Sequence, residues 1–378
     1  MIVCSAARRL GLSLATAFLG LALGSNGGAW AQAYPPDGTD FPTIAPNEGP
    51  EGAAGLKPLS VPPPKGFDQQ SIWNMKVVGF NDGQGRPSSD DGWIENQNGR
   101  YIVYMTSTGG SKLNPLTGKV ENSGTSLIDA TDPAHPVYLA NIPTETAAGA
   151  AHLAVCGGST LPGGQKNRWY MLRHDGPTNW EVWDTTDPAK PARLAVLIGS
   201  GKNTHHAWWE CDTGIAYAVF QSTSDGWHAN QHVYIWDLGD PAAPQFIRQF
   251  GLPGQQPRAN PAAQSCTNAP GPDCYEGVTN PPTGAHDIYS AGKTRNRVYI
   301  GYGSAANGIA QILDREKLLA GCAASANPQD CANNPSQADL LYPQISYLTL
   351  NPQDGAHTFI PIFGVPIPQE QTDFLTGT

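Results

Sequence analysis

Three segments of the chain repeat one pattern, a short apolar strand that ends in Asp-x-x-Asp-Pro-Ala-x-Pro. The copies begin at Asp129, Asp184 and Asp237, so they lie 55 and then 53 residues apart. A repeat of this period indicates an array of one supersecondary unit. The second Asp of each copy can accept a hydrogen bond from the backbone two residues later, and the Pro after it presets φ for a turn. We therefore interpret these Asp residues as structural turn residues.

Each copy lies in a unit of four expected strands separated by turn residues, and a fourth, more divergent unit follows. The expected strands span residues 92–94, 101–105, 126–128 and 137–140; 152–155, 169–172, 180–183 and 192–197; 206–210, 215–220, 233–236 and 245–250; and 286–289, 297–301, 309–314 and 345–350. Four short strands per unit are typical of a β-propeller blade. No segment after the first thirty residues has a long helical periodicity. The predicted fold class is all-β, a β-propeller.

The apolar strand before the repeated turn reads Ser126-Leu-Ile-Asp129, Glu181-Val-Trp-Asp184 and Val233-Tyr-Ile-Trp-Asp237. With its Asp-x-x-Asp-Pro-Ala-x-Pro tail, the chain resembles the LVIVD-repeat family of secreted bacterial propellers, over roughly residues 90 to 360. The resemblance implies an architecture rather than an activity, because one fold can carry many functions.

The two ends of the repeat region look like parts of one further blade. Residues 73–80 resemble an outer strand without its inner strands, and residues 357–363 open a fifth unit. Joining the termini would close the ring and remove exposed sheet edges. The prediction is five blades if the chain is complete, and six or seven if it is truncated.

The first 31 residues read as a cleavable secretory signal. Arg8 and Arg9 precede an apolar run from Leu10 to Leu23, and small residues lead to a cut near Ala31. That run is too short for a membrane span. Residues 32–66 are rich in Pro and Gly and predict a disordered leader, with a propeller domain over 67–378. The predicted location is periplasmic or secreted.

Six cysteines remain after the signal is removed, an even number suited to an oxidising compartment. Cys156 and Cys211 lie at matching places on neighbouring inner strands and are expected to bridge adjacent blades. The other four are expected to pair within two insertions, as Cys266 with Cys274 and Cys322 with Cys331.

The chain is acidic, with a formal net charge of −10, or −12 once Arg8 and Arg9 are removed. This charge argues against nucleic acid and anionic membranes as partners. The expected partner is a small molecule or a protein bound at the face where the inner strands begin.

Four histidines recur at one place in the repeat: His152, His206, His286 and His357 each begin the innermost strand of a unit. Innermost strands line the channel of a propeller, so their imidazoles should converge and could ligate a transition metal such as iron, copper or zinc. In the first unit the matching residue is Asp91, a carboxylate ligand or a turn residue. Further candidates near that face are His205, His174, His228, His232 and Asp175.

Three functions remain open from the sequence. The first is a binding module whose ligand lies near the histidines and their metal. The second is a metal-dependent oxidoreductase or hydrolase that uses the same ring. The third is a structural or protein-interaction propeller in which the repeated histidines only pack and hydrogen-bond. No catalytic sequence motif decides whether the protein is an enzyme.

Overall fold

The structure is a computed structural model that describes residues 78–197, 204–220, 225–229, 231–259, 284–321 and 328–364. The chain divides into two compact units, Met1–Phe80 with Pro133–His135, and Asn81–Asp132 with Pro136–Thr378. Every strand and helix given below belongs to the second unit. The predicted signal, the predicted leader and residues 73–77 lie outside the described residues. The proposed domain boundaries therefore stay predictions.

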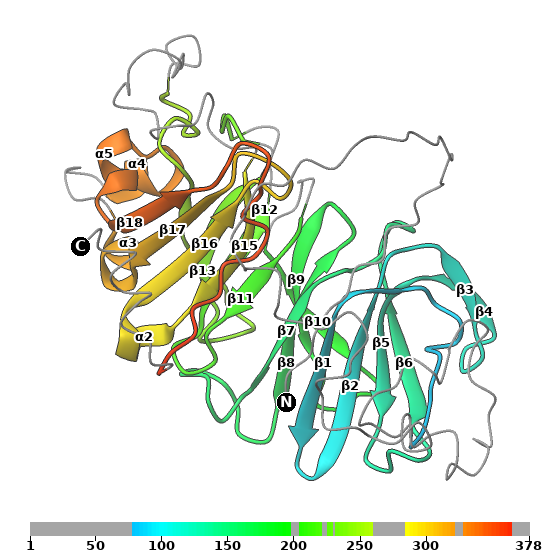
Figure 1. The fold of residues 1–378 in the computed structure, drawn as a ribbon. Helices are drawn as coiled ribbons and strands as arrows, with labels where there is room; N and C mark the ends of the chain where they lie inside the picture. Colours follow the sequence, from blue (N-terminus) through cyan, green and yellow to red (C-terminus); the bar gives the residue numbers. More distant parts are fainter. Residues whose placement is uncertain are drawn as a thin grey trace, which may run out of the picture. The chain divides into compact units, whose positions relative to one another are not determined.

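Four sheets, each of four antiparallel strands hydrogen-bonded in chain order, follow one another along the second unit (Figure 1). They comprise β1 (Ser88–Gln97), β2 (Arg100–Ser107), β5 (Gly124–Asp129) and β6 (Val137–Pro143); β7 (Leu153–Gly157), β8 (Trp169–Asp175), β9 (Asn179–Asp184) and β10 (Ala192–Val196); β11 (Ala207–Trp209), β12 (Ile215–Phe220), β13 (His232–Asp237) and β14 (Gln245–Phe250); and β15 (Ala285–Ser290), β16 (Arg297–Tyr302), β17 (Ile309–Asp314) and β18 (Gln344–Thr349). Every strand expected in the four units is present. The fold is mostly β and propeller-like, as predicted.

The repeated Asp residues form the turns that connect the third and fourth strands of a sheet. Asp187 Oδ1 accepts a hydrogen bond from the backbone N–H of Ala189 at 3.1 Å, and Asp240 Oδ1 accepts one from Ala242 at 3.0 Å. The first Asp of each copy makes the same bond at 2.7–2.9 Å, from Asp129 to Thr131, Asp184 to Thr186 and Asp237 to Gly239. The structural interpretation of these residues is confirmed.

The core lies between successive sheets, where apolar side chains from both faces pack together. Strand β12 illustrates the arrangement, because alternate residues of a strand point to opposite faces. Its odd residues, such as Tyr217, join the cluster with the fourth sheet, and its even residues, such as Phe220, join the cluster with the second. Burying such a side chain contributes about 1.5–3 kcal/mol. A continuous apolar strand is thus what a sheet packed on both faces requires.

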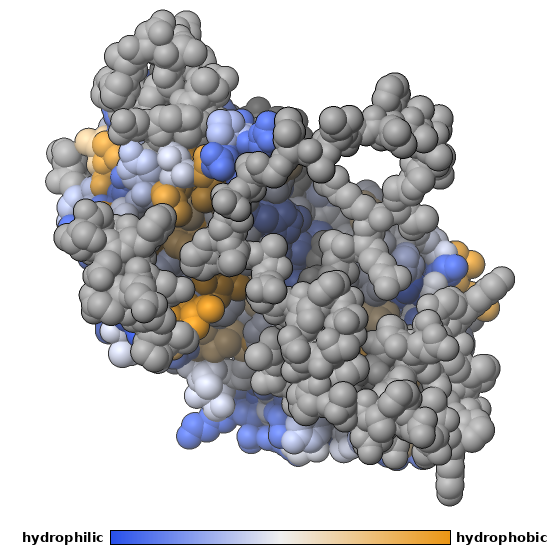
Figure 2. Space-filling view, viewed as in Figure 1, coloured by the Kyte–Doolittle hydropathy of each residue, from blue (hydrophilic) through white to orange (hydrophobic). Residues whose placement is uncertain are grey.

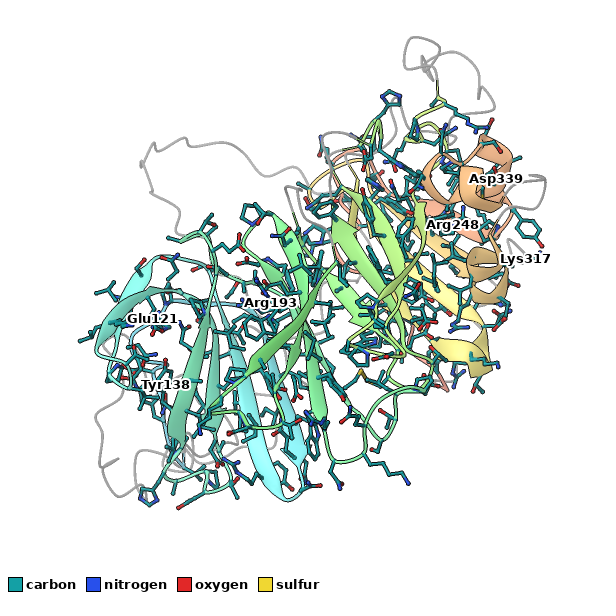
Figure 3. All side chains as sticks on the ribbon, turned by 180° about the vertical axis from the view of Figure 1, so that it is seen from behind. Glu121, Tyr138, Arg193, Arg248, Lys317 and Asp339 are labelled. Atoms are coloured by element: carbon teal, nitrogen blue, oxygen red, sulfur yellow. A yellow bond between two sulfur atoms is a disulfide. The ribbon has the colours of Figure 1, made fainter. Side chains whose placement is uncertain are left out.

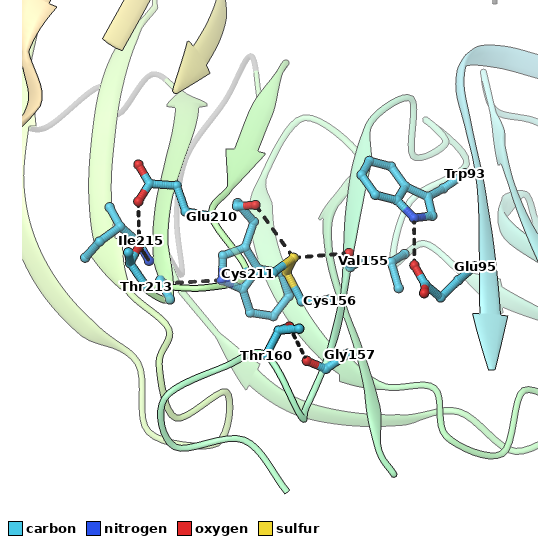
Figure 4. Close-up of a disulfide and its surroundings, with 12 residues drawn as sticks. Trp93, Glu95, Val155, Cys156, Gly157, Thr160, Glu210, Cys211, Thr213 and Ile215 are labelled. Carbon is cyan, nitrogen blue, oxygen red and sulfur yellow. Dashed lines mark hydrogen bonds between the residues drawn. A yellow bond between two sulfur atoms is a disulfide. The ribbon is translucent and has the colours of Figure 1, made fainter. Parts of the chain in front are cut away.

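The first strands of successive sheets contact one another, β1 with β7, β7 with β11, and β11 with β15. A disulfide joins Cys156 in β7 to Cys211, two residues after β11, with a Cα–Cα distance of 5.3 Å (Figure 4). The predicted link between adjacent units is confirmed. Cys331 in α4 (Pro328–Asn333) is also disulfide-bonded. Its expected partner Cys322 and the expected Cys266–Cys274 pair lie outside the described residues.

A buried ion pair ties the second sheet to the first. Arg173 in β8 pairs with Glu181 in β9 at 3.0 Å, and both side chains are 1% exposed. Arg173 also donates to the carbonyl oxygen of Ile142 in β6 at 2.9 Å. Arg193 on β10, which is labelled in Figure 3, reaches the other oxygen of Glu181 at 2.7 Å. Because a buried charge is costly when left alone, Arg173 and Glu181 each need the other, and the half-exposed Arg193 adds a second cation beside Glu181.

Several short elements were not predicted from the sequence. A hairpin of β3 (Ser111–Asn114) and β4 (Lys119–Asn122) lies between β2 and β5, and the helices α2 (Gly292–Arg295), α3 (Arg315–Ala320), α4 and α5 (Gln337–Leu341) flank strands of the fourth sheet. Local capping forms two of these helices: Asp314 accepts from Lys317 N, and Ser336 and Asp339 make a capping box. None of the described helices is both long and apolar enough to cross a membrane.

The expected strand at 357–363 is wrong, because these residues have no regular structure. Pro361 lacks the N–H that a ladder needs, which disfavours a strand here. The segment instead lies beside the fourth sheet, with the ring of Phe359 5.5 Å from that of Tyr299. Figure 2 shows hydrophobic residues exposed on this side, and Ile360 and Ile362 are 58% and 81% exposed.

Candidate metal centre

Histidines from three successive units converge where the first strands begin. His152 and His206 directly precede β7 and β11, and His286 is the second residue of β15. The ring centroids of His152 and His206 are 3.8 Å apart, and those of His206 and His286 are 5.2 Å apart. The repeat therefore brings together three of the four histidines chosen from the sequence for their position.

His205 completes this group, which we call the histidine centre (His152, His205, His206 and His286). Ligand nitrogens of the first three lie within 4.8 Å of one another. The Nε2 atom of His205 is 2.7 Å from Nε2 of His286. Nitrogen ligands of a tetrahedral zinc ion, at about 2.0–2.1 Å from the metal, are about 3.3 Å apart. The 4.8 Å limit is wider than this value and the 2.7 Å contact, a hydrogen-bond distance, is shorter, so the rings would have to shift to bring these nitrogens onto one ion.

Two of the four imidazoles are hydrogen-bonded through Nδ1 to an oxygen atom, and the Nδ1 atom of a third lies near one. His152 Nδ1 lies 2.9 Å from Asp91 Oδ2, and His206 Nδ1 lies 3.5 Å from Asp287 Oδ1. His286 Nδ1 lies 2.8 Å from the carbonyl oxygen of His357. An oxygen acceptor on Nδ1 fixes the tautomer that protonates Nδ1 and makes Nε2 the ligating nitrogen. Metal-binding histidines are commonly oriented in this way.

The centre is buried at His152 and His286 and half-buried at His205 and His206, and this burial changes the protonation of the last two imidazoles. Burial, followed by the charges of His152 and the other neighbouring histidines, lowers the pKa of His205 to about 3. The same causes hold the pKa of His206 well below its usual range. Burial raises the pKa of the Asp287 carboxyl. Both imidazoles are therefore neutral at neutral pH, which is the form that ligates a metal.

Asp91 and His357, expected at the same repeat position as His152, His206 and His286, lie beside the histidine centre and are not among its four histidines. Asp91 lies in β1, where the first unit has no histidine, and it holds His152 from there. His357 is exposed, and its ring lies 3.8 Å from that of His286. It borders the centre and contributes its backbone oxygen to the orientation of His286.

His174 has a structural environment. The segment Arg173-His174-Asp175, expected in a loop, forms the end of β8 instead, because it continues the ladder with β9. His174 Nε2 accepts from Ala151 N–H at 2.5 Å, and Nδ1 lies 2.8 Å from Gly176 O. Burial lowers its pKa to about 3. Both nitrogens are therefore occupied by the backbone.

Asp175 is likewise engaged in holding the chain. Its Oδ1 atom accepts a hydrogen bond from the backbone N–H of Glu145 at 2.9 Å. Burial raises the pKa of this carboxyl, and the side chain is 1% exposed. No contact with the histidine centre is among those found for it in the described part of the chain.

His232 and His228 lie apart from the centre. His232 begins β13, its ring stacks on Trp227 at 4.3 Å, and its Nε2 lies 2.8 Å from Gln249 Oε1. Burial lowers the pKa of His232 to about 4. His228 is exposed, with its backbone N–H donating to Gln255 O.

His205 and Asp287 contribute more to the site than the sequence indicates. The doubled His205-His206 marks His205 only as a further candidate, and Asp287 is visible only as the residue that directly follows His286. In a strand, neighbouring side chains point to opposite faces, so a dipeptide can supply two separate groups. Asp287 thereby reaches His206 while His286 contacts His205.

Comparison with known proteins identifies no relative. The sequence matches no family model and no curated protein. Among solved structures, similarity is found to U3-55K (8% identity, TM-score 0.36, 63% of this chain and 51% of that one). It is also found to Raptor from Chaetomium thermophilum (9%, 0.39, 72% and 17%) and to an exo-beta-1,3-galactanase from Phanerochaete chrysosporium (14%, 0.26, 43% and 39%). The chain spans about half or less of each of these proteins, and none of these likenesses bears on its function.

Proposed function

We propose that this protein binds one transition metal ion through His152, His205, His206 and His286. The observation that carries the proposal is the arrangement of Nδ1 contacts. One carboxylate and one carbonyl oxygen hydrogen-bond Nδ1 of His152 and His286, and a second carboxylate lies 3.5 Å from Nδ1 of His206. The structural His174 is also held through Nδ1, but the rings of the centre differ from it in meeting one another from three units.

The donor set limits which metals are suitable. Neutral imidazole nitrogens suit zinc, copper and iron, whereas magnesium and calcium prefer oxygen ligands. Four histidines are at hand, so a metal held by three of them would keep a position for a further ligand. An open position of this kind is what separates a catalytic zinc site from a closed structural one.

A second candidate function, a metal-dependent oxidoreductase or hydrolase, is favoured by one further observation. A pocket of about 270 Å³ adjoins the centre and is lined by His206, Asp91 and Asp287. A metal with an accessible cavity beside it can polarise a bound molecule or activate water. The pocket favours this function over that of an empty scaffold.

We further propose that the four sheets belong to a closed propeller of the LVIVD-repeat type that works outside the cytoplasm. The meeting of the first strands around one cluster supports a common axis. The disulfide between neighbouring sheets supports an oxidising compartment, in agreement with the predicted secretory signal.

A calorimetric titration of metal-free protein with Zn²⁺ tests the metal site. We expect one ion per chain, and binding at least a hundredfold weaker in His206→Ala. His228→Ala is the matched control, since it removes an exposed histidine outside the centre and should bind as the wild type does. The proposal is overturned if Zn²⁺, Cu²⁺ and Fe²⁺ all fail to bind at one site, or if His206→Ala binds normally.

A further inference from the structure

The pocket beside the centre has walls from all four sheets. Its lining comes from β1 (Asp91, Gly92 and Trp93), β7 (Leu153 and Ala154), the start of β11 (His206, Ala207, Trp208 and Trp209) and β15 (Asp287). Its volume, about 270 Å³, is just below the range of about 300–1,000 Å³ that is usual for small-molecule sites. A molecule of roughly a single substituted ring would fit.

The lining is divided by chemistry. Asp91, His206 and Asp287 are polar, and each belongs to the histidine centre or holds one of its imidazoles. Among the remaining groups, Trp93 and Trp208 offer large aromatic surfaces, and both are only partly buried.

Both indoles are held in place by neighbours. Trp93 Nε1 donates to Glu95 Oε2 at 3.3 Å (Figure 4). The ring of Trp208 lies 4.5 Å from that of Tyr289. Positioned aromatic rings bind other rings well because little side-chain freedom is lost on binding.

We infer that this pocket binds a small aromatic molecule whose polar head is an uncharged hydrogen-bond donor, such as a phenol. Its ring lies among the tryptophans, and its single O–H donates to the carboxylate of Asp287, which lines the pocket together with Asp91. The same two carboxylates disfavour an anionic head, because like charges repel and a carboxylate has no proton to donate. The inference rests on the proposed function in one respect: the head that meets the carboxylates also reaches the metal beside His206.

Calorimetry on metal-free protein tests the ligand class without involving the metal. The probes are 4-methylphenol and 4-methylbenzoate, which share a ring and differ in the head. We expect 4-methylphenol to bind at least tenfold more tightly. Equal binding of the two, or no binding of either, overturns the inference.

Two variants locate the binding. Trp208→Leu should weaken 4-methylphenol at least tenfold, whereas Trp236→Leu, a control at a partly buried indole outside the pocket, should leave it unchanged. Asp287→Asn keeps the shape of the side chain and should reduce the preference for the phenol over the benzoate about tenfold. An unchanged preference in Asp287→Asn, or equal losses in both tryptophan variants, contradicts the assignment.

A spectroscopic experiment tests whether the head reaches the metal. Protein loaded with Co²⁺ is titrated with 4-methylphenol, and the visible absorption bands of the ion should shift at the concentration that saturates calorimetric binding. Bound phenol without a shift overturns contact with the metal. Failure of Co²⁺ to bind counts against the proposed function alone, because the metal-free titrations still decide the ligand class.

Discussion

The molecule places buried histidines from the same repeat in two different environments. At the histidine centre, His152 and His286 are hydrogen-bonded through Nδ1 to an oxygen, His206 Nδ1 lies 3.5 Å from one, and the rings of all three face other imidazoles. Elsewhere, His174 is occupied by backbone groups at both nitrogens, and His232 by Gln249 and the face of Trp227. Burial alone therefore does not mark a ligand. The partner of each nitrogen separates a histidine that holds the chain from one that can hold a metal.

The sharpest test of this comparison is to remove two histidines of the centre together. His152→Ala with His286→Ala should weaken metal binding at least about a thousandfold, since loss of an orienting partner alone commonly costs 10–100-fold. Competition with a chromophoric chelator measures the affinity. His232→Gln, at a buried histidine outside the centre, should leave it unchanged. A centre that retains its affinity in the double variant is not the metal site.

Removing a structural histidine, one whose nitrogens are bound by other groups of the chain, should lower stability and leave metal affinity unchanged. His174→Ala leaves the Ala151 N–H without its imidazole acceptor, whereas the Gly176 carbonyl still accepts from the Thr204 hydroxyl. Because one unsatisfied buried group costs about 1–3 kcal/mol, we expect a loss of about 2 kcal/mol in the free energy of unfolding. Urea denaturation of the metal-free protein measures this loss. If His174→Ala lowered metal affinity as much as His206→Ala does, His174 would have to be counted among the metal-binding histidines.

The structural histidines should also make stability depend on pH. The folded-state pKa of His232 is about 4 because of burial, against an unfolded value of about 6.5, so the unfolded state binds more protons between these values. Stability is therefore full above about pH 6.5 and falls as pH drops toward 4, by about 3 kcal/mol for this group.

His232→Gln removes this titration. The difference in unfolding free energy between wild type and His232→Gln should then change steadily between pH 7 and pH 4.5 in the metal-free protein. A difference that is constant with pH would mean that His232 is accessible to protons in the folded state.

The smallest expected effect concerns the groups that orient the imidazoles. Asp91→Asn keeps the size of the side chain but weakens its acceptor for His152, and it should reduce metal affinity by about 10–100-fold. Asp225→Asn, at the carboxylate 3.4 Å from His232, is the matched change beside a structural histidine. It should leave metal affinity unaltered. Equal losses of metal affinity in Asp91→Asn and Asp225→Asn would mean that Asp91 has no special role in orienting a metal ligand.

Most of the fold could be predicted from the sequence because the same four-strand pattern occurs in four successive units. Residues that alternate between two buried faces, as in Ile215–Phe220, and turns built on Asp and Pro fix each strand and its connection. The β3–β4 hairpin and the short helices escaped prediction because they occur once and rest on local capping, as at Ser336 and Asp339.

The site was accessible only in part. Repetition marked His152, His206 and His286, since equivalent positions in an array meet around one place. It could not separate His174 from them, because the backbone groups that occupy its nitrogens come from tertiary packing. The repeat also could not predict that Asp287 lies beside His206, because the two residues belong to different sheets, the fourth and the third.

Elemental analysis of the protein shows most directly whether the histidine centre holds a metal ion. The protein would be purified without a histidine tag or chelator and measured by mass spectrometry for iron, copper and zinc. We expect about one ion per chain in the wild type and almost none in His152→Ala with His286→Ala. Wild-type protein that stays metal-free after incubation with each of these ions would contradict this expectation.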